Sequence, residues 1–301
     1  MKILNFGSCN IDYVYSLDHI VRNGETQSVR QMQTFAGGKG LNQSVALSRA
    51  GARVYHAECI GHDGEMLREL LFECGVDTSY LRTVDCKNGH AIIQVSDAGD
   101  NCIIVCAGSN ACVDEDFADS VLSGFGEGDI VLLQNEISCV PYIIDKAHER
   151  GMCVVFNPSP IDATALSIDL GKLSYALLNE TEARQLSGAE SAEQALKLLC
   201  ERYPDLGVVL TLGARGCIYA RGDVRVRQRA FEAQVVDTTA AGDTFAGYFV
   251  AQISRGESCE RALRVASAAS SVAISRKGAA PSIPCADEVL SRLDNMKEID
   301  N

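Results

Sequence analysis

Hydrophobic positions along most of the chain alternate between two kinds of segment. Short runs that are apolar throughout, such as 130–134 and 153–157, are followed by longer segments whose apolar residues have helical spacing. Continuous apolar runs of this length are typical of strands buried on both faces of a parallel sheet. Because these strands alternate with helices of roughly 9 to 12 residues, the pattern predicts an α/β fold with a doubly wound, mostly parallel sheet.

The segments of this series have clear limits, because glycines and polar residues end most of them. We expect strands at 2–6, 54–60, 130–134, 153–157, 175–179 and 208–212. We expect helices at 40–50, 66–74, 140–150, 191–202 and 245–255, with a short charged helix after Pro284. Since no internal repeat or long linker interrupts the series, we expect a single domain over residues 1–301.

Two stretches break the alternation. Residues 12–33 lack helical spacing, and residues 89–108 contain two strand-like runs joined by the polar turn 98–100. The second stretch is typical of a β-hairpin. Such a hairpin forms either a new edge of the main sheet or a separate small sheet. We favour a small β-sheet lid over the carboxyl ends of the strands, where α/β proteins bind ligands.

Composition narrows the range of partners. The chain has 40 acidic and 27 basic residues and a net charge of −13, which argues against nucleic acid or an anionic membrane as the main partner. Its 13 cysteines are dispersed and form no CxxC pair. Because their number is odd and no leader-like segment opens the sequence, we expect a reduced, cytoplasmic setting rather than a disulfide framework or zinc cluster.

The segment 237–245, DTTAAGDTF, carries the most chemical information. Asp237 and the threonines that follow it are residue types that cap helices, and the small residues 240–242 leave their backbone amides uncovered. The first amides of a helix, together with its dipole, attract anions. Asp243 in the same turn suggests a base beside an anion hole. The alternative is an ordinary capped helix in which Asp243 complements the dipole.

Polar residues near the amino terminus suit the recognition of a polyol. Asn10 and Asp12 follow the first strand, and in an extended chain they point to the same side. The glycine-rich loop 37–40 precedes a helix that holds Asn42, and its lysine, Lys39, is followed by Gly rather than Ser or Thr, so the loop is not a Walker A motif. The alternative is an Asx turn at Asn10 with a solvated lysine.

Three further loops follow predicted strands. Asn179 and Glu182 open a helix, where they could cap it or orient water bound to Mg²⁺. The loop 211–216 contains the glycines of a tight turn, and 275–284 is stiffened by two prolines. No GxGxxG follows the first strand, which disfavours a dinucleotide-dependent oxidoreductase.

Several motifs in order, from about residue 3 to residue 284, carry a resemblance to a known family. They are GSCNID, GGKGLNQ, NPSP, LLNETEA, TLGARG, DTTAAGDTF and SRKGAAPSIP. The chain resembles the ribokinase group of the PfkB sugar and nucleoside kinase family. The resemblance implies an ATP-dependent kinase that phosphorylates the O5 hydroxyl of D-ribose and uses Mg²⁺ and K⁺. Two alternatives are a PfkB kinase of deoxyribose, fructose or a nucleoside, and a non-catalytic sugar-binding regulator.

The resemblance also implies a role for individual residues. Asp243 corresponds to the catalytic base, and an anion hole is implied at Ala240, Ala241, Gly242 and the amide of Asp243. A sugar site is implied at Asn10, Asp12, Gly38, Lys39, Asn42, Glu136 and Asp243. ATP contacts are implied at Asn179, Glu182, Thr211, Gly213 and Gly216. A monovalent cation site is implied at Asp237, Thr239, Ala273, Arg276, Gly278 and Ser282. The family's lid also serves as a dimer interface, which implies a homodimer.

Overall fold

The structure is a computed structural model that describes residues 1–299, so the end of the predicted 1–301 domain lies outside the described residues. Its main sheet contains the strands β1 (Ile3–Phe6), β4 (Val54–Gly61), β5 (Asp77–Val84), β8 (Ile130–Gln134), β9 (Cys153–Asn157), β10 (Tyr175–Asn179), β11 (Gly207–Thr211), β12 (Cys217–Arg221) and β13 (Val224–Gln228). Their order is β13-β12-β11-β10-β9-β8-β1-β4-β5. All neighbours are parallel except β12 and β13, which add an antiparallel edge.

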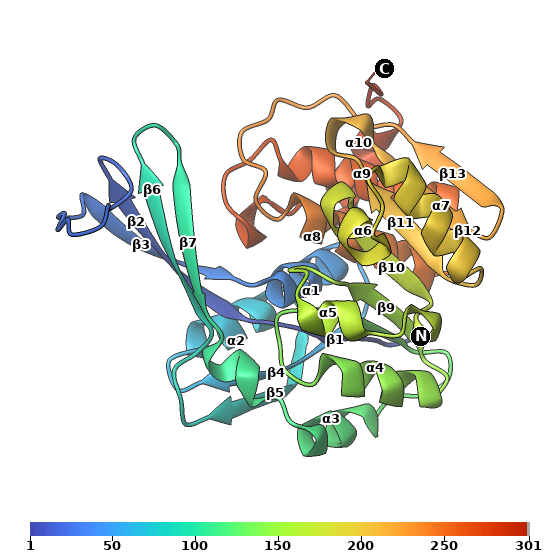
Figure 1. Cartoon of the computed structure of the whole chain (residues 1–301), viewed down its shortest axis with the longest axis horizontal. Coiled ribbons are helices and arrows are strands. Elements are labelled where there is room, and N and C mark those ends of the chain that lie inside the picture. The colour runs from blue at the N-terminus through green and yellow to red at the C-terminus, as the bar shows by residue number, and fades with distance from the viewer. Residues whose placement is uncertain (300–301) are drawn as a thin grey trace.

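Helices cover both faces of this sheet (Figure 1). One face carries α1 (Lys39–Arg49), α2 (Glu65–Glu73), α8 (Ala241–Ser254), α9 (Cys259–Ala273) and α10 (Ala286–Leu293). The other carries α3 (Glu115–Leu122), α4 (Val140–Glu149), α5 (Ala163–Ser167), α6 (Glu180–Ser187) and α7 (Ala192–Arg202). The predicted doubly wound, mostly parallel sheet is therefore confirmed.

The two helical layers explain why the strands are apolar throughout. In β8, Ile130 and Leu132 belong to one hydrophobic core, whereas Val131 and Leu133 belong to the core on the opposite face. Side chains alternate along a strand, so a strand such as β8 needs apolar residues at successive positions to fill both cores. Among residues 1–299, no helix has the length and apolar character needed to cross a membrane.

A separate four-stranded sheet projects from the main domain (Figure 1). It consists of β2 (Asn10–Leu17), β3 (Gln31–Gly37), β6 (His90–Ser96) and β7 (Asn101–Cys106), in the order β3-β2-β6-β7. The strands β6 and β7 form the hairpin expected within 89–108, with Ile93 opposite Ile103. The hairpin is thus part of a small separate sheet, the lid, and not an edge of the main sheet.

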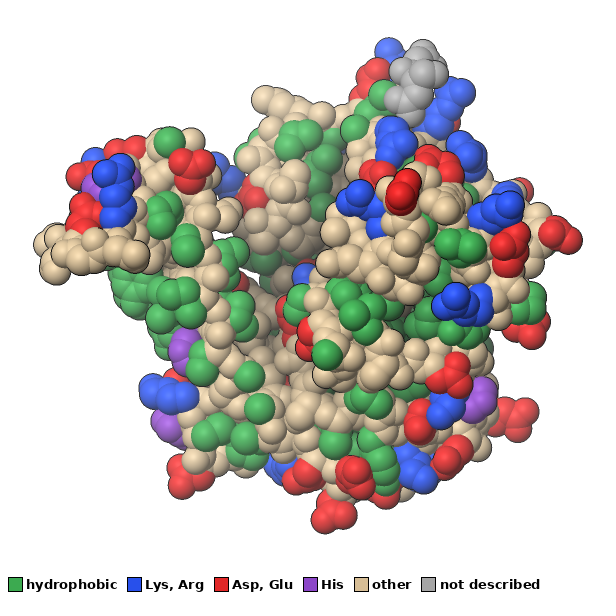
Figure 2. All heavy atoms as spheres, viewed as in Figure 1, with side chains coloured by type: hydrophobic (Ala, Val, Ile, Leu, Met, Phe, Trp, Pro, Cys, Tyr) green, Lys and Arg blue, Asp and Glu red, His purple; other side chains and the backbone are tan. Residues whose placement is uncertain are grey.

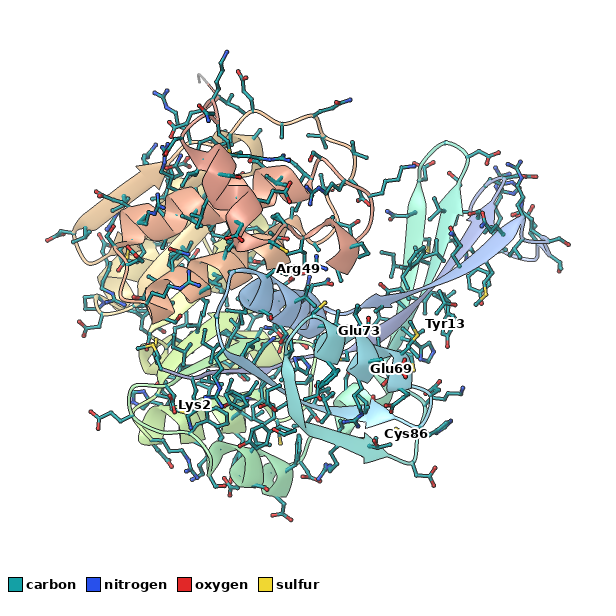
Figure 3. All side chains as sticks on the ribbon, turned by 180° about the vertical axis from the view of Figure 1, so that it is seen from behind. Lys2, Tyr13, Arg49, Glu69, Glu73 and Cys86 are labelled. Carbon is teal, nitrogen blue, oxygen red and sulfur yellow. The ribbon has the colours of Figure 1, made fainter. Side chains whose placement is uncertain are left out.

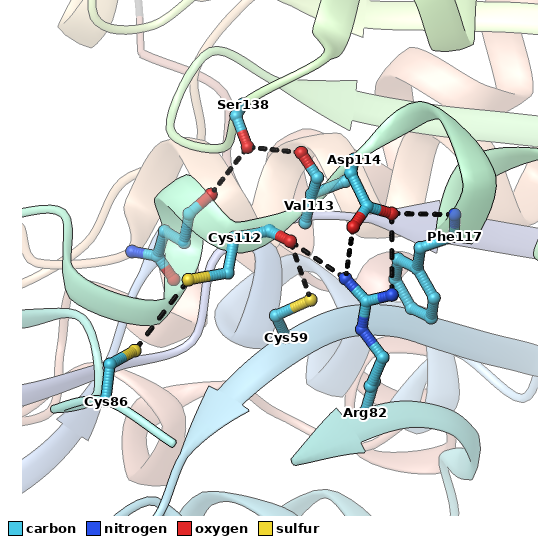
Figure 4. Close-up of polar contacts among 9 residues, drawn as sticks. Cys59, Arg82, Cys86, Cys112, Val113, Asp114, Phe117 and Ser138 are labelled. Carbon is cyan, nitrogen blue, oxygen red and sulfur yellow. Dashed lines mark hydrogen bonds and ion pairs between the residues drawn. The ribbon is translucent and has the colours of Figure 1, made fainter. Parts of the chain in front are cut away.

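Polar contacts fix the base of the lid hairpin to the main domain (Figure 4). Arg82 of β5 pairs with Asp114 at 3.1 Å. Ser138 Oγ donates to the carbonyl of Val113 at 2.6 Å, just after the 3₁₀ turn Gly108–Cys112 that follows β7. Residues 113 and 114, which follow the lid hairpin, are therefore held to the main domain by two different residues, Arg82 and Ser138.

Arg49, at the end of α1 and labelled in the view from behind in Figure 3, contacts the loop 280–283. Its guanidinium donates to the carbonyl of Ala280 at 2.7 Å and to that of Ile283 at 2.5 Å. This contact holds the Pro-containing loop beside the carboxyl end of α1.

Candidate functional site

Two cavities meet where the amino ends of α1 and α8 approach each other. The larger cavity, of about 870 Å³, lies between the lid and the main domain, and the smaller one, of about 250 Å³, lies over β10 and β11. Figure 2 shows the hollow beside the lid. Lys39, Ala240 and Asp243 line both cavities. A group transferred between the two cavities would therefore pass these three residues.

Every residue predicted for the sugar site lines the larger cavity. They are Asn10, Asp12, Gly38, Lys39, Asn42, Glu136 and Asp243. The side chains of Asn10 and Asp12 face the cavity from one side of β2, as their i, i+2 spacing predicts. Asn110, which the sequence reasoning missed, donates from Nδ2 to Asn10 Oδ1 at 2.7 Å and so fixes the Asn10 amide.

The glycine-rich loop before α1 has a steric reason for its composition. Gly38 has φ = 93°, and a Cβ there would lie 2.8 Å from the carbonyl oxygen of Ser8. A Cβ on Gly40 would lie 2.2 Å from the carbonyl carbon of Gly7. Only glycine allows this approach, which places Lys39 at the first position of α1 beside both cavities.

Acidic groups surround the Lys39 side of the larger cavity. Glu136 Oε2 accepts hydrogen bonds from Ser8 Oγ at 2.5 Å and from the amide of Lys39 at 3.0 Å. Burial raises the pKa of Asp12 to about 6, and the charge of Glu136 adds to this rise. Burial lowers the pKa of Lys39, but the charges of Asp243, Glu136 and Glu182 outweigh it and leave that pKa raised.

Asp243 is buried in the first turn of α8 and held by two amides. Asn42 Nδ2 donates to Oδ2 at 3.1 Å, and Gln43 Nε2 donates to Oδ1 at 2.9 Å. Burial raises the pKa of Asp243, while the charge of Lys39 and the two amide donors oppose that rise. The result is an oriented carboxylate of raised basicity, as a general base requires.

The amino end of α8 is not capped by a side chain, so the expected cap at Asp237 and its threonines is wrong. Ala240 precedes the helix with φ = 57° and offers no capping oxygen. Within residues 1–299, the amides of Gly242 and Asp243 have no acceptor, whereas that of Ala241 donates to Thr238 at 3.2 Å. The free amides border the smaller cavity and suit an anion.

Asp237 instead joins two loops. Its Oδ1 accepts from the amide of Thr239 and its Oδ2 from the amide of Gly278, both at 2.9 Å. The Asp237 amide in turn donates to the carbonyl of Ile274 at 3.2 Å. The structure therefore brings the predicted cation-site residues 237–239 next to 273–278.

The other residues predicted for the cation site lie in or beside the second loop. The carbonyl of Ala273 accepts from the amide of Arg276 at 3.0 Å, and the Arg276 side chain pairs with Glu288. Ser282 is buried, and its Oγ donates to the carbonyl of Ala279 at 2.8 Å. Among residues 1–299 the bond from Arg276 is the one hydrogen bond that the Ala273 carbonyl accepts outside its helix, so one lone pair of that oxygen stays available.

Three of the predicted ATP residues line the smaller cavity, namely Asn179, Glu182 and Thr211. Asn179 and Glu182 form a reciprocal capping box on α6, in which each side chain accepts from the other residue's amide at 2.9 Å. Gly213 and Gly216 lie in the turn between β11 and β12, outside that lining. The lining also includes residues that the sequence reasoning did not assign, namely Asn157, Ser159 and Thr238.

Comparisons with known proteins agree over nearly the whole chain. The model of the pfkB family carbohydrate kinases matches residues 1–286. A ribokinase of Haemophilus influenzae is 36% identical over 299 residues, which cover 96% of this chain and 97% of that protein. The crystal structure of a ribokinase from Cryptococcus neoformans in complex with ADP has a TM-score of 0.87 at 33% identity, with 97% of this chain and 99% of that chain covered. An Arabidopsis thaliana ribokinase complexed with ribose and ATP has a TM-score of 0.86 at 32% identity, with 97% and 98% covered.

Proposed function

This chain belongs to the pfkB family of carbohydrate kinases, and we propose that it transfers the γ-phosphoryl group of ATP to the O5 hydroxyl of D-ribose. The observation that carries the proposal is the meeting of a polar cavity under the lid with a second cavity at the free amides of α8. Asp243 lies where the two cavities meet, so it is placed between an acceptor hydroxyl and a phosphoryl group.

The polar side chains of the larger cavity suit the hydroxyl groups of ribose. Asn42 Oδ1 is buried and has no hydrogen-bond partner among the described residues, so a sugar hydroxyl would satisfy it. Asp12 and Glu136 supply carboxylate acceptors on the same cavity wall, and Lys39 supplies a donor. A set of acceptors with one ammonium donor matches the hydroxyls of a small free sugar.

The chemistry is a direct in-line transfer. Asp243 takes the proton of the O5 hydroxyl while that oxygen forms its bond to the γ-phosphorus, and the bond from phosphorus to the leaving oxygen of ADP breaks. The free amides of Gly242 and Asp243 hold the negative charge that the transferred group carries. Lys39 adds a positive charge where the cavities meet.

Mg²⁺ would enter with ATP. Among residues 1–299, no cluster of three or more His, Cys, Asp or Glu side chains is arranged to hold a metal. Glu182, on the wall of the smaller cavity, would hold the ion through water, which suits an ion that keeps much of its hydration. When bound, Mg²⁺ neutralises charge on the phosphates.

A K⁺ ion fits the region between the 237–239 and 273–282 segments. The Asp237 carboxylate lies there beside the segment 273–282, which begins with the last residue of α9, Ala273, and includes Gly278 and Ser282. Carbonyl oxygens with one anionic oxygen are a ligand set that replaces the hydration shell of a monovalent cation. When bound, K⁺ adds positive charge close to the amino end of α8.

The lid would close over the sugar and join two copies of the chain. Ile103 and Val105 line the larger cavity, so Ile104 between them projects from the outer face of β7. Ile104 is 57% exposed and lies opposite Ile92, which makes the outer face apolar as well. A homodimer through this face would cover it, and Ile104→Asp should convert the dimer to a monomer in light scattering.

A reduced, cytoplasmic setting is part of this proposal, because the thirteen cysteines are dispersed along the chain and form no CxxC pair.

A coupled ADP-release screen tests the function. Ribose, deoxyribose, fructose and nucleosides are compared as acceptors, each with and without K⁺, and the wild type is compared with Asp243→Asn. We expect ribose to give the highest kcat/KM and K⁺ to raise it. A higher kcat/KM for another acceptor would contradict the ribose assignment, and no ADP release with any acceptor would contradict the kinase itself.

A further inference from the structure

Two buried glutamines lie behind the site, and neither lines the larger or the smaller cavity. Gln43, in α1, and Gln134, at the end of β8, are both fully buried. Neither residue is among those that form the walls of the two cavities. Neither can therefore touch the sugar or ATP, and any effect that they have on the reaction must pass through another residue.

These glutamines form a chain of hydrogen bonds with Asp243 and Asn5. Gln134 Nε2 donates to Gln43 Oε1 at 2.7 Å and to Asn5 Oδ1 at 3.0 Å. Gln43 Nε2 donates to Asp243 Oδ1 at 2.9 Å and to Asn157 Oδ1 at 3.1 Å. Each NH₂ group has two hydrogens, so both donors of both glutamines are used.

The orientation of each amide is fixed by the next one. Asn5 Nδ2 donates to the carbonyl of Gly40 at 2.7 Å and to Ser44 Oγ at 2.8 Å, so Asn5 must present its oxygen to Gln134. Gln134 must then present its nitrogen, and Gln43 must present its oxygen to Gln134 and its nitrogen to Asp243. A reversal of Gln43 would place its oxygen against the Asp243 carboxylate, where two acceptors repel.

The space around Gln134 is shaped to hold it. A Cβ on Gly7 would lie only 2.1 Å from Gln134 Oε1, so glycine at this position leaves room for the amide. That Oε1 atom has no hydrogen-bond partner within the described part of the chain. A buried unpaired oxygen costs free energy, so Gln134 is not placed here as a simple means of stabilising the core.

We propose that Gln134 is a positioning residue that holds the Gln43 amide in the one orientation in which Gln43 donates to Asp243. This inference rests on the proposed role of Asp243 as the base. The chain of amides fixes the carboxylate so that its free lone pairs face the cavity, and fixed geometry is what proton abstraction requires.

The test uses Gln134→Met, which keeps an unbranched side chain of similar length but has no donor. We expect kcat to fall by roughly 10-fold to 100-fold, since small displacements of a catalytic group have effects of this size. KM for ribose and for ATP should change by less than about threefold, because the lost interaction is not a substrate contact. The acid limb of kcat against pH should move to higher pH, because the Gln43 donor lowers the pKa of Asp243.

Tyr248→Phe is the matched control. It removes a buried hydrogen bond, Tyr248 Oη to the carbonyl of Pro284 at 2.8 Å, from the same helix as Asp243 but away from both cavities. Its thermal stability should fall while its kcat and acid limb stay unchanged. An equal shift of the acid limb in Tyr248→Phe would show a general structural effect and overturn the proposal.

A double-mutant cycle with Gln43→Met separates a route through Gln43 from an independent effect. If Gln134 acts through Gln43, the double variant should have the same kcat as Gln43→Met alone. If the losses in kcat of the two single variants instead add up in the double variant, the proposal is overturned. If Gln134→Met does not fold, Gln134→Leu takes its place. A kcat equal to that of the wild type in whichever of these variants folds would contradict the positioning role of Gln134. Asp243→Asn distinguishes a failure of the proposed base from a failure of the proposed positioning residue. Full activity in Asp243→Asn would contradict the role of Asp243 as the base. Loss of activity in Asp243→Asn, together with wild-type activity in the Gln134 variants, would contradict only the positioning role of Gln134.

Discussion

Asn42 and Asp243 are 201 residues apart in the chain, yet Asn42 Nδ2 donates to Asp243 Oδ2 at 3.1 Å. The bond joins the first turn of α1 to the first turn of α8. It therefore couples the wall of the larger cavity to the carboxylate that also borders the smaller one. The remaining donor of that carboxylate, Gln43, comes from the same turn of α1.

Lys39→Gln should move the acid limb of kcat to higher pH. The positive charge of Lys39 lowers the pKa of Asp243, whereas burial raises it. Without that charge the pKa of Asp243 should rise further, so the base becomes protonated at a higher pH. Lys277→Gln is the control, because Lys277 also lines the larger cavity but is not among the groups that shift the pKa of Asp243. An unmoved limb in Lys39→Gln would contradict this electrostatic account.

Ribose affinity should depend on pH near 6. Asp12 has its pKa raised to about 6, so below that pH it takes up a proton and loses acceptor capacity for sugar hydroxyls. KM for ribose should therefore rise as the pH falls through this value.

Glu136→Gln tests the cause of that dependence. The charge of Glu136 contributes to the raised pKa of Asp12, so its removal should shift the inflection of KM to lower pH. Glu25→Gln, in the exposed loop between β2 and β3, should leave the inflection in place. A shift to higher pH in Glu136→Gln would be incompatible with like-charge repulsion.

Gly242 and Gly40 should respond differently to a side chain. A Cβ on Gly242 meets no protein atom within 4 Å, so Gly242→Val should fold normally but obstruct the free amides. We expect kcat/KM for ATP to fall by about 100-fold, the cost of losing an anion-hole donor. Gly40→Ala should instead lower stability by about 1–3 kcal/mol, because its Cβ meets the backbone of Gly7. Full ATP activity in Gly242→Val would remove the anion hole from the account.

Asp237→Asn should abolish activation by K⁺. The substitution removes the one negative charge of the predicted cation site and weakens the contacts with Thr239 and Gly278. The measurement is kcat/KM against KCl concentration at constant ionic strength, with Glu232→Gln as a control nearby in the sequence. A wild type that does not respond to K⁺ would contradict the cation site altogether.

The sequence predicted the fold where local pattern and tertiary structure agree. Strands such as 130–134 and 153–157 were located to the residue, because burial on both faces requires a continuous apolar run. By contrast, β13 was missed because its polar residues do not follow that rule at the exposed edge of the sheet. The neighbouring strand β12 was also missed, although its first four residues are apolar and buried, as the rule requires. The helix α9 was also missed, although its buried residues Leu263, Ala266 and Ala269 recur at helical spacing.

The candidate site shows the same division. Residues at strand ends, such as Asn10 and Asn179, could be predicted to lie at a cavity, because loops at the carboxyl ends of parallel strands must converge. Asn110 and Gln134 were not found, because their importance depends on single hydrogen bonds to residues at least 91 positions away. The expected cap on α8 was wrong because Asp237 bonds to Gly278 instead, a contact that no local pattern indicates.

The most direct test of the central claim is the turnover of Asp243→Asn in coupled ADP release with ribose, alongside calorimetric binding of ribose. The account predicts a kcat lower by roughly two or more orders of magnitude, since general-base catalysis contributes about that much. Ribose binding should largely survive, because the other cavity residues remain. Turnover close to that of the wild type would contradict the claim that Asp243 takes the proton.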